Sequence, residues 1–128
     1  QGSSAKQKLS PILTLDDFFE IQKTAGSIFV SPIVVDYIVA LSQVTRTNPQ
    51  ISLGVSPRGS LALYNAAQVL ALSLGRHYVI PDDVKALAPK IWEHRLILTP
   101  KAKLEGAKRI DVMQTNVASV AVPTMKEK

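Results

Sequence analysis

Arg58 is the residue whose position in this sequence most favours chemistry. It follows Ser56 and Pro57, a pair typical of a helix start, with serine as the N-cap and proline at the first helical position. Arg58 therefore falls in the first turn, where the helix dipole disfavours a positive charge by about 0.3–1 kcal/mol. A guanidinium beside free backbone N–H groups is suited to binding phosphate. The alternative is that Arg58 reaches water or a nearby carboxylate.

The rest of the sequence lacks the residue sets of an enzyme active site. It contains no GxxxxGK[ST] phosphate loop and no pair of acidic residues after a strand that would hold magnesium. His77 and His94 have no second metal-type ligand at helical spacing, so we expect no metal site. Ser56 and Ser60 lack the pattern of a nucleophile elbow. We therefore expect no catalytic residue in this chain.

Composition restricts the class of protein further. The chain has 128 residues, of which 46% are hydrophobic, enough for the core of one domain. It has no cysteine, no signal-peptide pattern and no apolar run of the ~20 residues that a membrane span needs, so we expect a cytoplasmic protein without membrane contact. The formal charge is +5, but lysines and one glutamate in the two tails supply +3 of it. A solvated surface of mixed charge is therefore favoured over a nucleic-acid interface.

Helical periodicity between turn signals predicts a mainly α fold, a small helical bundle with at most a short two-stranded β ribbon. Helices are expected over residues 15–24, 32–47, 57–74, 81–88, 90–95 and 108–119, with Pro89 breaking or kinking the fourth. Residues 50–55 are expected to form a loop. The apolar stretch 96–98 is expected to pair with residues 28–30 as the ribbon.

The helix over residues 57–74 is expected to be central because it is apolar on most sides. Its polar edge is expected at Tyr64, Asn65 and Gln68. Its most buried residues are expected to be the following: Leu63, Ala66, Ala67, Leu70 and Leu74.

Several short motifs in this order resemble the lid segment of MoxR-family AAA+ ATPases. Residues Gly54–Ser60 are similar to the family's GxSPRxS segment, and Val44-Thr45-Arg46 resembles the "TR" ending of the helix before it. The further matching segments are Gly75–Val79, Pro81–Val84 and His94–Leu96. Each motif is weak alone, but their order and spacing together are specific. The resemblance covers nearly the whole chain, from about Leu15 to Val122.

This resemblance implies a C-terminal helical lid that follows an α/β ATPase domain, with residues 10–122 as the lid, 1–9 as a linker or cloning remnant and 123–128 as a frayed tail. It implies that Arg58 is the sensor-2 arginine, which contacts the γ-phosphate of ATP, with Ser56 and Pro57 setting the helix start. ATP and Mg²⁺ would be bound in the intact parent protein, not by this chain alone.

The implied partners are the N-terminal ATPase domain, sister subunits of a hexameric ring and von Willebrand factor A-type proteins. The implied activity is chaperone-like remodelling of other proteins. Whether Arg58 acts in cis or in trans stays open.

Other residues are secondary candidates. Arg46 is a candidate ligand, although a role at the C-terminal end of its own helix is favoured. Arg76 is expected to pair with Asp82 or Asp83, and Trp92 is expected in the core. His94 and Arg95 either hold the junction between helix and strand or face the ATPase domain.

Two other functions compete with the nucleotide-sensing lid. One is a helical protein-interaction module with no nucleotide role. The other is a helix-turn-helix domain that binds nucleic acid, with Gly75 between its two helices; its binding would weaken steeply with salt.

Overall fold

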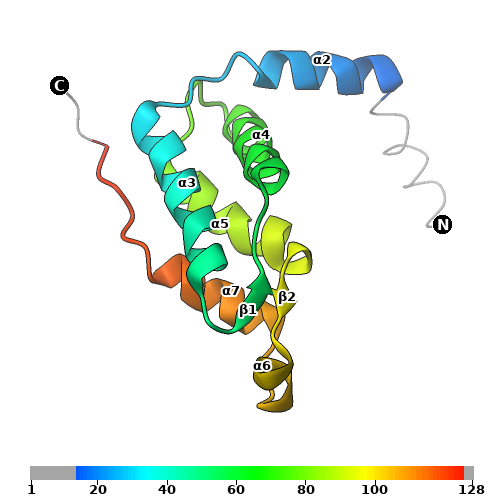
Figure 1. Ribbon diagram of the computed structural model, residues 1–128. Coiled ribbons are helices and arrows are strands. Elements are labelled where there is room, and N and C mark those ends of the chain that lie inside the picture. The colour runs from blue at the N-terminus through cyan, green and yellow to red at the C-terminus, as the bar shows by residue number, and fades with distance from the viewer. Residues whose placement is uncertain (1–13, 126–128) are drawn as a thin grey trace, which may run out of the picture.

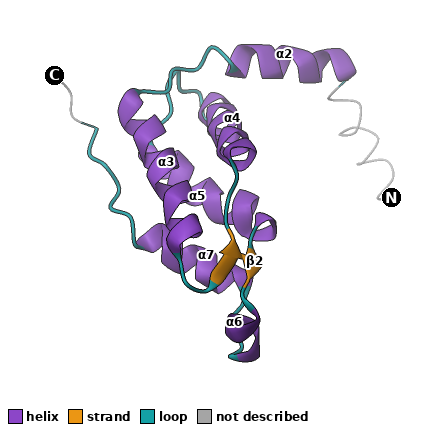
Figure 2. Ribbon diagram, in the orientation of Figure 1, coloured by secondary structure: helices purple, strands orange, loops and turns teal. Residues whose placement is uncertain are grey.

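The computed structural model describes residues 14–125 and shows a mainly α fold, as the sequence predicts (Figure 1). Its elements are α2 (Leu15–Ala25), α3 (Pro32–Thr47), β1 (Ile51–Leu53), α4 (Pro57–Ser73), α5 (Pro81–Trp92), the 3-10 turn η2 (Glu93–Arg95), β2 (Ile97–Leu98), α6 (Pro100–Leu104) and α7 (Arg109–Ala118). Helices α3, α4, α5 and α7 pack together, whereas α2 projects from this group and touches it through α4. The segment after α7 returns along α3 (Figure 2).

The helix starts follow from local capping chemistry. Ser31, Ser56 and Thr99 each precede a proline, and each side-chain oxygen accepts a hydrogen bond from a backbone N–H in the first turn. Thr14 and Asp17 form a reciprocal capping box at the start of α2. The starts at Thr14, Ser31 and Ser56 agree with those predicted from the sequence, because capping depends on residues close together in the chain. The short helix α6 after Thr99 was not among the predicted helices.

Helix α4 contributes one buried face to the core rather than being buried on most sides. Leu63, Ala67 and Ala71 are fully buried at a spacing of four residues, whereas Leu74, expected in the core, is 61% exposed. Ala66 and Leu70 are only partly buried, so the expected core was wrong at these positions. The expected polar edge is wrong at Gln68, which is buried. The fold tolerates this buried amide because its nitrogen donates a hydrogen bond to the carbonyl of Ile28 at 2.8 Å.

The ribbon exists, but its predicted pairing is wrong. Strand β2 pairs antiparallel with β1, which lies in the predicted loop 50–55. Residues 28–30 instead meet the segment after α4 through a parallel bridge between Phe29 and Tyr78. The physical reason is the packing of Trp92, just before η2, against Gly59 at the start of α4. Because β1 leads into α4 and β2 follows η2, this contact brings the two strands together.

Of the break or kink expected at Pro89, the structure excludes the break. A break does not occur there: α5 continues through Pro89 to Trp92 and then tightens into η2. Proline removes one backbone hydrogen bond, but Ala88 and Trp92 on either side are fully buried. Tertiary packing therefore outweighs the local preference at this position.

Helix α2 exposes apolar side chains. Leu15 is 68% exposed, Phe18 48% and Phe19 55%. Between residues 14 and 125, no helix has the length and hydropathy to cross a bilayer. Leu15, Phe18 and Phe19 together form a patch of exposed apolar surface on α2.

Candidate functional site: the arginines at the start of α4

The start of α4 is built so that Arg58 faces solvent. The Ser56 hydroxyl accepts a hydrogen bond from the Gly59 amide at 3.3 Å, and Pro57 supplies the first helical residue. Arg58 follows, is exposed, and has no ion pair or hydrogen bond from its side chain among residues 14–125. Its backbone N–H likewise has no acceptor within that range. An unpaired guanidinium and a free amide therefore lie together at the positive end of a helix, an arrangement that favours an anion.

The loop before α4 is fixed to the end of α3 through Thr45. This fully buried side chain accepts a hydrogen bond from the Val55 amide at 2.9 Å and donates one to the Ser42 carbonyl. Gly54 lies so close that a Cβ atom there would be 2.7 Å from the Thr45 carbonyl oxygen and 2.7 Å from its hydroxyl oxygen. The glycine before the Ser-Pro-Arg sequence is thus required by close approach of the backbone.

Arg46 lies at the same end of α4. Its Nε donates to the Val55 carbonyl at 3.0 Å, and its side chain is otherwise exposed. Arg46 is also the basic residue of the last turn of α3, the role that the sequence favoured. The hydrogen bond to Val55, the residue before Ser56, therefore holds Arg46 at the start of α4.

Arg95 reaches this end of α4 from η2, a contact that sequence reasoning missed. The Trp92 indole N–H donates to the Gly59 carbonyl at 2.8 Å, and Trp92 is fully buried, as expected. A Cβ atom on Gly59 would lie 3.3 Å from Cδ of Arg95 and 2.7 Å from Cγ1 of Val55. The stem of Arg95 therefore packs over the first turn of α4. In the sequence, the glycine at position 59 was the available signal that another residue packs against this turn. It could not identify Arg95 as that residue, because Arg95 is distant in sequence.

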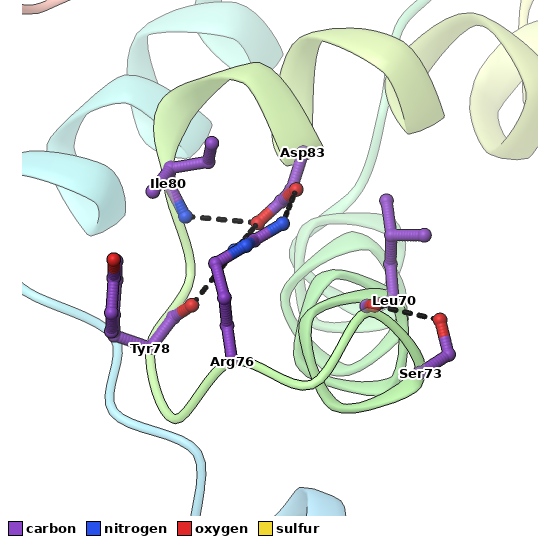
Figure 3. Close-up of polar contacts among 6 residues, drawn as sticks. All are labelled: Leu70, Ser73, Arg76, Tyr78, Ile80 and Asp83. Atoms are coloured by element: carbon purple, nitrogen blue, oxygen red, sulfur yellow. Dashed lines mark hydrogen bonds and ion pairs between the residues drawn. The ribbon is translucent and has the colours of Figure 1, made fainter.

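Arg76 forms the ion pair expected from the sequence and serves the fold. Its guanidinium donates to both carboxylate oxygens of Asp83, at 2.8 and 2.6 Å, and to the Tyr78 carbonyl (Figure 3). Asp83 is buried and also accepts from the Ile80 amide, so it caps α5. The hydrogen bond to Asp83 raises the pKa of Arg76 above its ordinary value. Arg76 is thereby committed to the turn between α4 and α5.

The histidines lie apart from any ligand set. His94 is exposed and lies 4.0 Å from Glu93, its neighbour in η2. His77 is exposed in the turn after α4. Over the part of the chain that the structure describes, no three His, Asp or Glu side chains are placed to hold a metal ion. The start of α4 is therefore the site with the best-defined chemistry.

Comparison with known proteins identifies the same architecture. The family model described as the AAA lid domain matches residues 43–123, which include Arg46, Arg58 and Arg95. A solved structure of a proposed ATPase from Cytophaga hutchinsonii superposes with a TM-score of 0.78 at 27% sequence identity, covering 85% of this chain and 36% of that one.

The similar sequences include proteins with MoxR names. The chain is 36% identical to Chaperone MoxR1 of Mycobacterium tuberculosis over 121 residues, which covers 88% of this chain and 32% of that protein. It is 40% identical to the YeaC protein of Bacillus subtilis over 120 residues, covering 94% of this chain and 38% of the relative. Protein MoxR of Methylorubrum extorquens is 34% identical over 71 residues, covering 55% of this chain and 21% of that protein. The chain thus spans about a third of the length of the first two relatives.

Proposed function

This chain belongs to the AAA lid domains, as the C-terminal lid of a MoxR-family AAA+ ATPase, and we propose that it senses bound nucleotide through Arg58. In this proposal Arg58 is the sensor-2 residue: its guanidinium binds the γ-phosphate of ATP in the intact protein. Ser56 and Pro57 start the helix that presents it. Mg²⁺ and the Walker motifs belong to the N-terminal ATPase domain, and the lid couples hydrolysis to movement.

The observation that carries the proposal is the state of Arg58. The side chain is exposed, has no partner among residues 14–125, and lies beside a free amide in a first turn where its charge is disfavoured. A phosphate would satisfy both groups through charge-assisted hydrogen bonds. The fold supports this proposal by fixing the preceding loop through Thr45 and Gly54.

The role of the whole protein forms a wider part of the proposal. We propose a cytoplasmic, ring-forming ATPase, hexameric as the family resemblance implies, that remodels partner proteins in the manner of a chaperone. One relative is named a chaperone. Proteins of the von Willebrand factor A type are the proposed partners.

Substitution of Arg58 in the intact ATPase tests the proposal. Arg58→Ala removes a contact worth about 1.5–3 kcal/mol, so ATP turnover is expected to slow by ~10- to 150-fold if the contact forms in the transition state. The melting temperature should hardly change, because the side chain is exposed. Arg58→Lys should restore turnover only in part, because ammonium lacks the planar fork.

Lys101→Ala is the matched control, since it removes an exposed positive charge from α6. Normal turnover with Arg58→Ala would contradict the sensor role, as would a loss fully explained by unfolding. Mixing subunits distinguishes cis from trans action. If Arg58 acts in trans, Arg58→Ala subunits should regain turnover when mixed with subunits that cannot bind ATP but keep Arg58.

A protein-interaction role is the second candidate, and the exposed apolar side of α2 favours it. Leu15, Phe18 and Phe19 would provide a contact surface without any nucleotide. If turnover survives Arg58→Ala but partner binding is lost on Phe18→Ser with Phe19→Ser, this second function replaces the first.

A further inference from the structure

Arg95 is held in place from both sides along the chain. On its N-terminal side, the buried Trp92 is hydrogen-bonded to Gly59 in the first turn of α4. On its C-terminal side, β2 pairs with β1, which leads into the same helix. The intervening η2 turn therefore has little freedom, and the arginine stem is fixed over Gly59.

The residue at position 59 makes this placement possible. Glycine is a poorer helix former than alanine, by up to about 1 kcal/mol in a helix interior, so its presence at the third position of α4 needs a reason. Here a Cβ atom would lie 3.3 Å from Cδ of Arg95 and 2.7 Å from Val55. Gly59 therefore allows Arg95 to lie directly against the turn that carries Arg58.

The local charge is not balanced by an acidic side chain. Within residues 14–125, the ion pairs are Arg76 with Asp83 and His94 with Glu93, so neither Arg58 nor Arg95 has a carboxylate partner. The nearest acid in sequence, Glu93, contacts His94 instead. Both arginines are exposed at the positive end of α4, and Arg46 adds a third positive charge there. A multiply charged anion would be attracted to this group of positive charges.

We propose that Arg95 is a second phosphate-binding arginine, which grips the terminal phosphate of the same nucleoside triphosphate as Arg58. This inference rests on the proposed function, since it assumes that a nucleotide meets Arg58. The inference adds a second phosphate-binding side chain from a different element, since Arg58 lies in α4 and Arg95 in η2. Two arginines approaching from different elements would discriminate a triphosphate from a diphosphate better than one.

The test uses the intact ATPase and measures binding of a non-hydrolysable ATP analogue and of ADP. Arg95→Met keeps an unbranched stem against Gly59 but removes the charge. We expect it to weaken binding of the ATP analogue by roughly 10-fold, to leave ADP affinity within about 2-fold, and to leave the melting temperature unchanged. Arg95→Lys should recover part of the discrimination. Lys101→Met on α6 is the control for loss of one positive charge.

A double variant tests whether both arginines bind one group. Because they share a phosphate, the loss from Arg58→Ala with Arg95→Met should differ from the product of the two single losses. If Arg58→Ala weakens binding of the analogue but Arg95→Met leaves it within about 2-fold, the inference about Arg95 fails and the proposed function stands. If Arg58→Ala has no effect, the proposed function fails. Equal losses for the ATP analogue and ADP, or a lower melting temperature, would give Arg95 a structural role and overturn the inference.

Discussion

At the scale of single residues, the site is shaped as much by its glycines as by its arginines. Gly54 allows the loop before α4 to approach Thr45, and Gly59 allows Val55, Trp92 and Arg95 to meet the first turn. Both positions are restricted by neighbouring atoms and not by unusual backbone angles, since the positive-φ glycines are Gly75 and Gly106. Gly54 and Gly59 therefore allow the neighbouring residues to pack closely around the turn that carries the exposed Arg58.

Gly59→Ala is the prediction at this scale. Alanine is the better helix former by about 1 kcal/mol, but its Cβ would lie 2.7 Å from Cγ1 of Val55. Overpacking should outweigh the helix preference, so we expect a net loss of about 1–2 kcal/mol of unfolding free energy. Urea unfolding followed by circular dichroism would measure it.

Gly26→Ala provides the matched control, because its Cβ would meet nothing closer than 3.4 Å. Its unfolding free energy should change by less than about 0.5 kcal/mol. A Gly59→Ala variant more stable than the parent would mean that Val55 and Arg95 move aside easily, and the close packing at the site would be refuted.

At the scale of elements, the structure shows which parts of the fold are locally encoded. Helix starts at Pro32 and Pro57 could be predicted because the capping serine and the proline are adjacent in sequence. The pairing of β2 with β1 could not, because it depends on how α4 and η2 pack.

The same distinction holds for the site. Arg58 could be singled out as a candidate because a positive charge in the first turn of a helix breaks a local rule. Arg95 could not, because its contact with Gly59 depends on the Trp92 hydrogen bond across 33 residues of sequence.

The buried face of α4 gives the prediction at this scale. Leu63→Ala should cost about 2–5 kcal/mol, because the side chain is fully buried between helices. Leu61, two residues earlier on the same helix, is 57% exposed, and Leu61→Ala should cost less than about 0.5 kcal/mol. Thermal and urea unfolding of both variants would compare them. Similar losses would mean that the burial pattern of α4 differs in solution.

At the scale of the whole molecule, the proposed function makes this chain one side of a nucleotide site. Arg46, Arg58 and Arg95 lie at the N-terminal end of α4, and no GxxxxGK[ST] loop occurs in the sequence. In the proposed function the remaining contacts come from the ATPase domain or a neighbouring subunit. The relatives support this division, because this chain matches about a third of the length of Chaperone MoxR1.

The last prediction therefore concerns this chain of 128 residues on its own. A few charge-assisted hydrogen bonds must overcome the ~4 kcal/mol or more that association costs, so we expect ATP to bind at millimolar affinity or weaker and no hydrolysis to occur. Isothermal calorimetry and a phosphate-release assay would measure both, with a helical circular dichroism spectrum confirming that the chain is folded. Raising salt should weaken whatever binding remains, because the contacts are ionic and exposed. A micromolar dissociation constant would show that this domain alone encloses a nucleotide, and lid and ATPase domain would then no longer be two halves of one site.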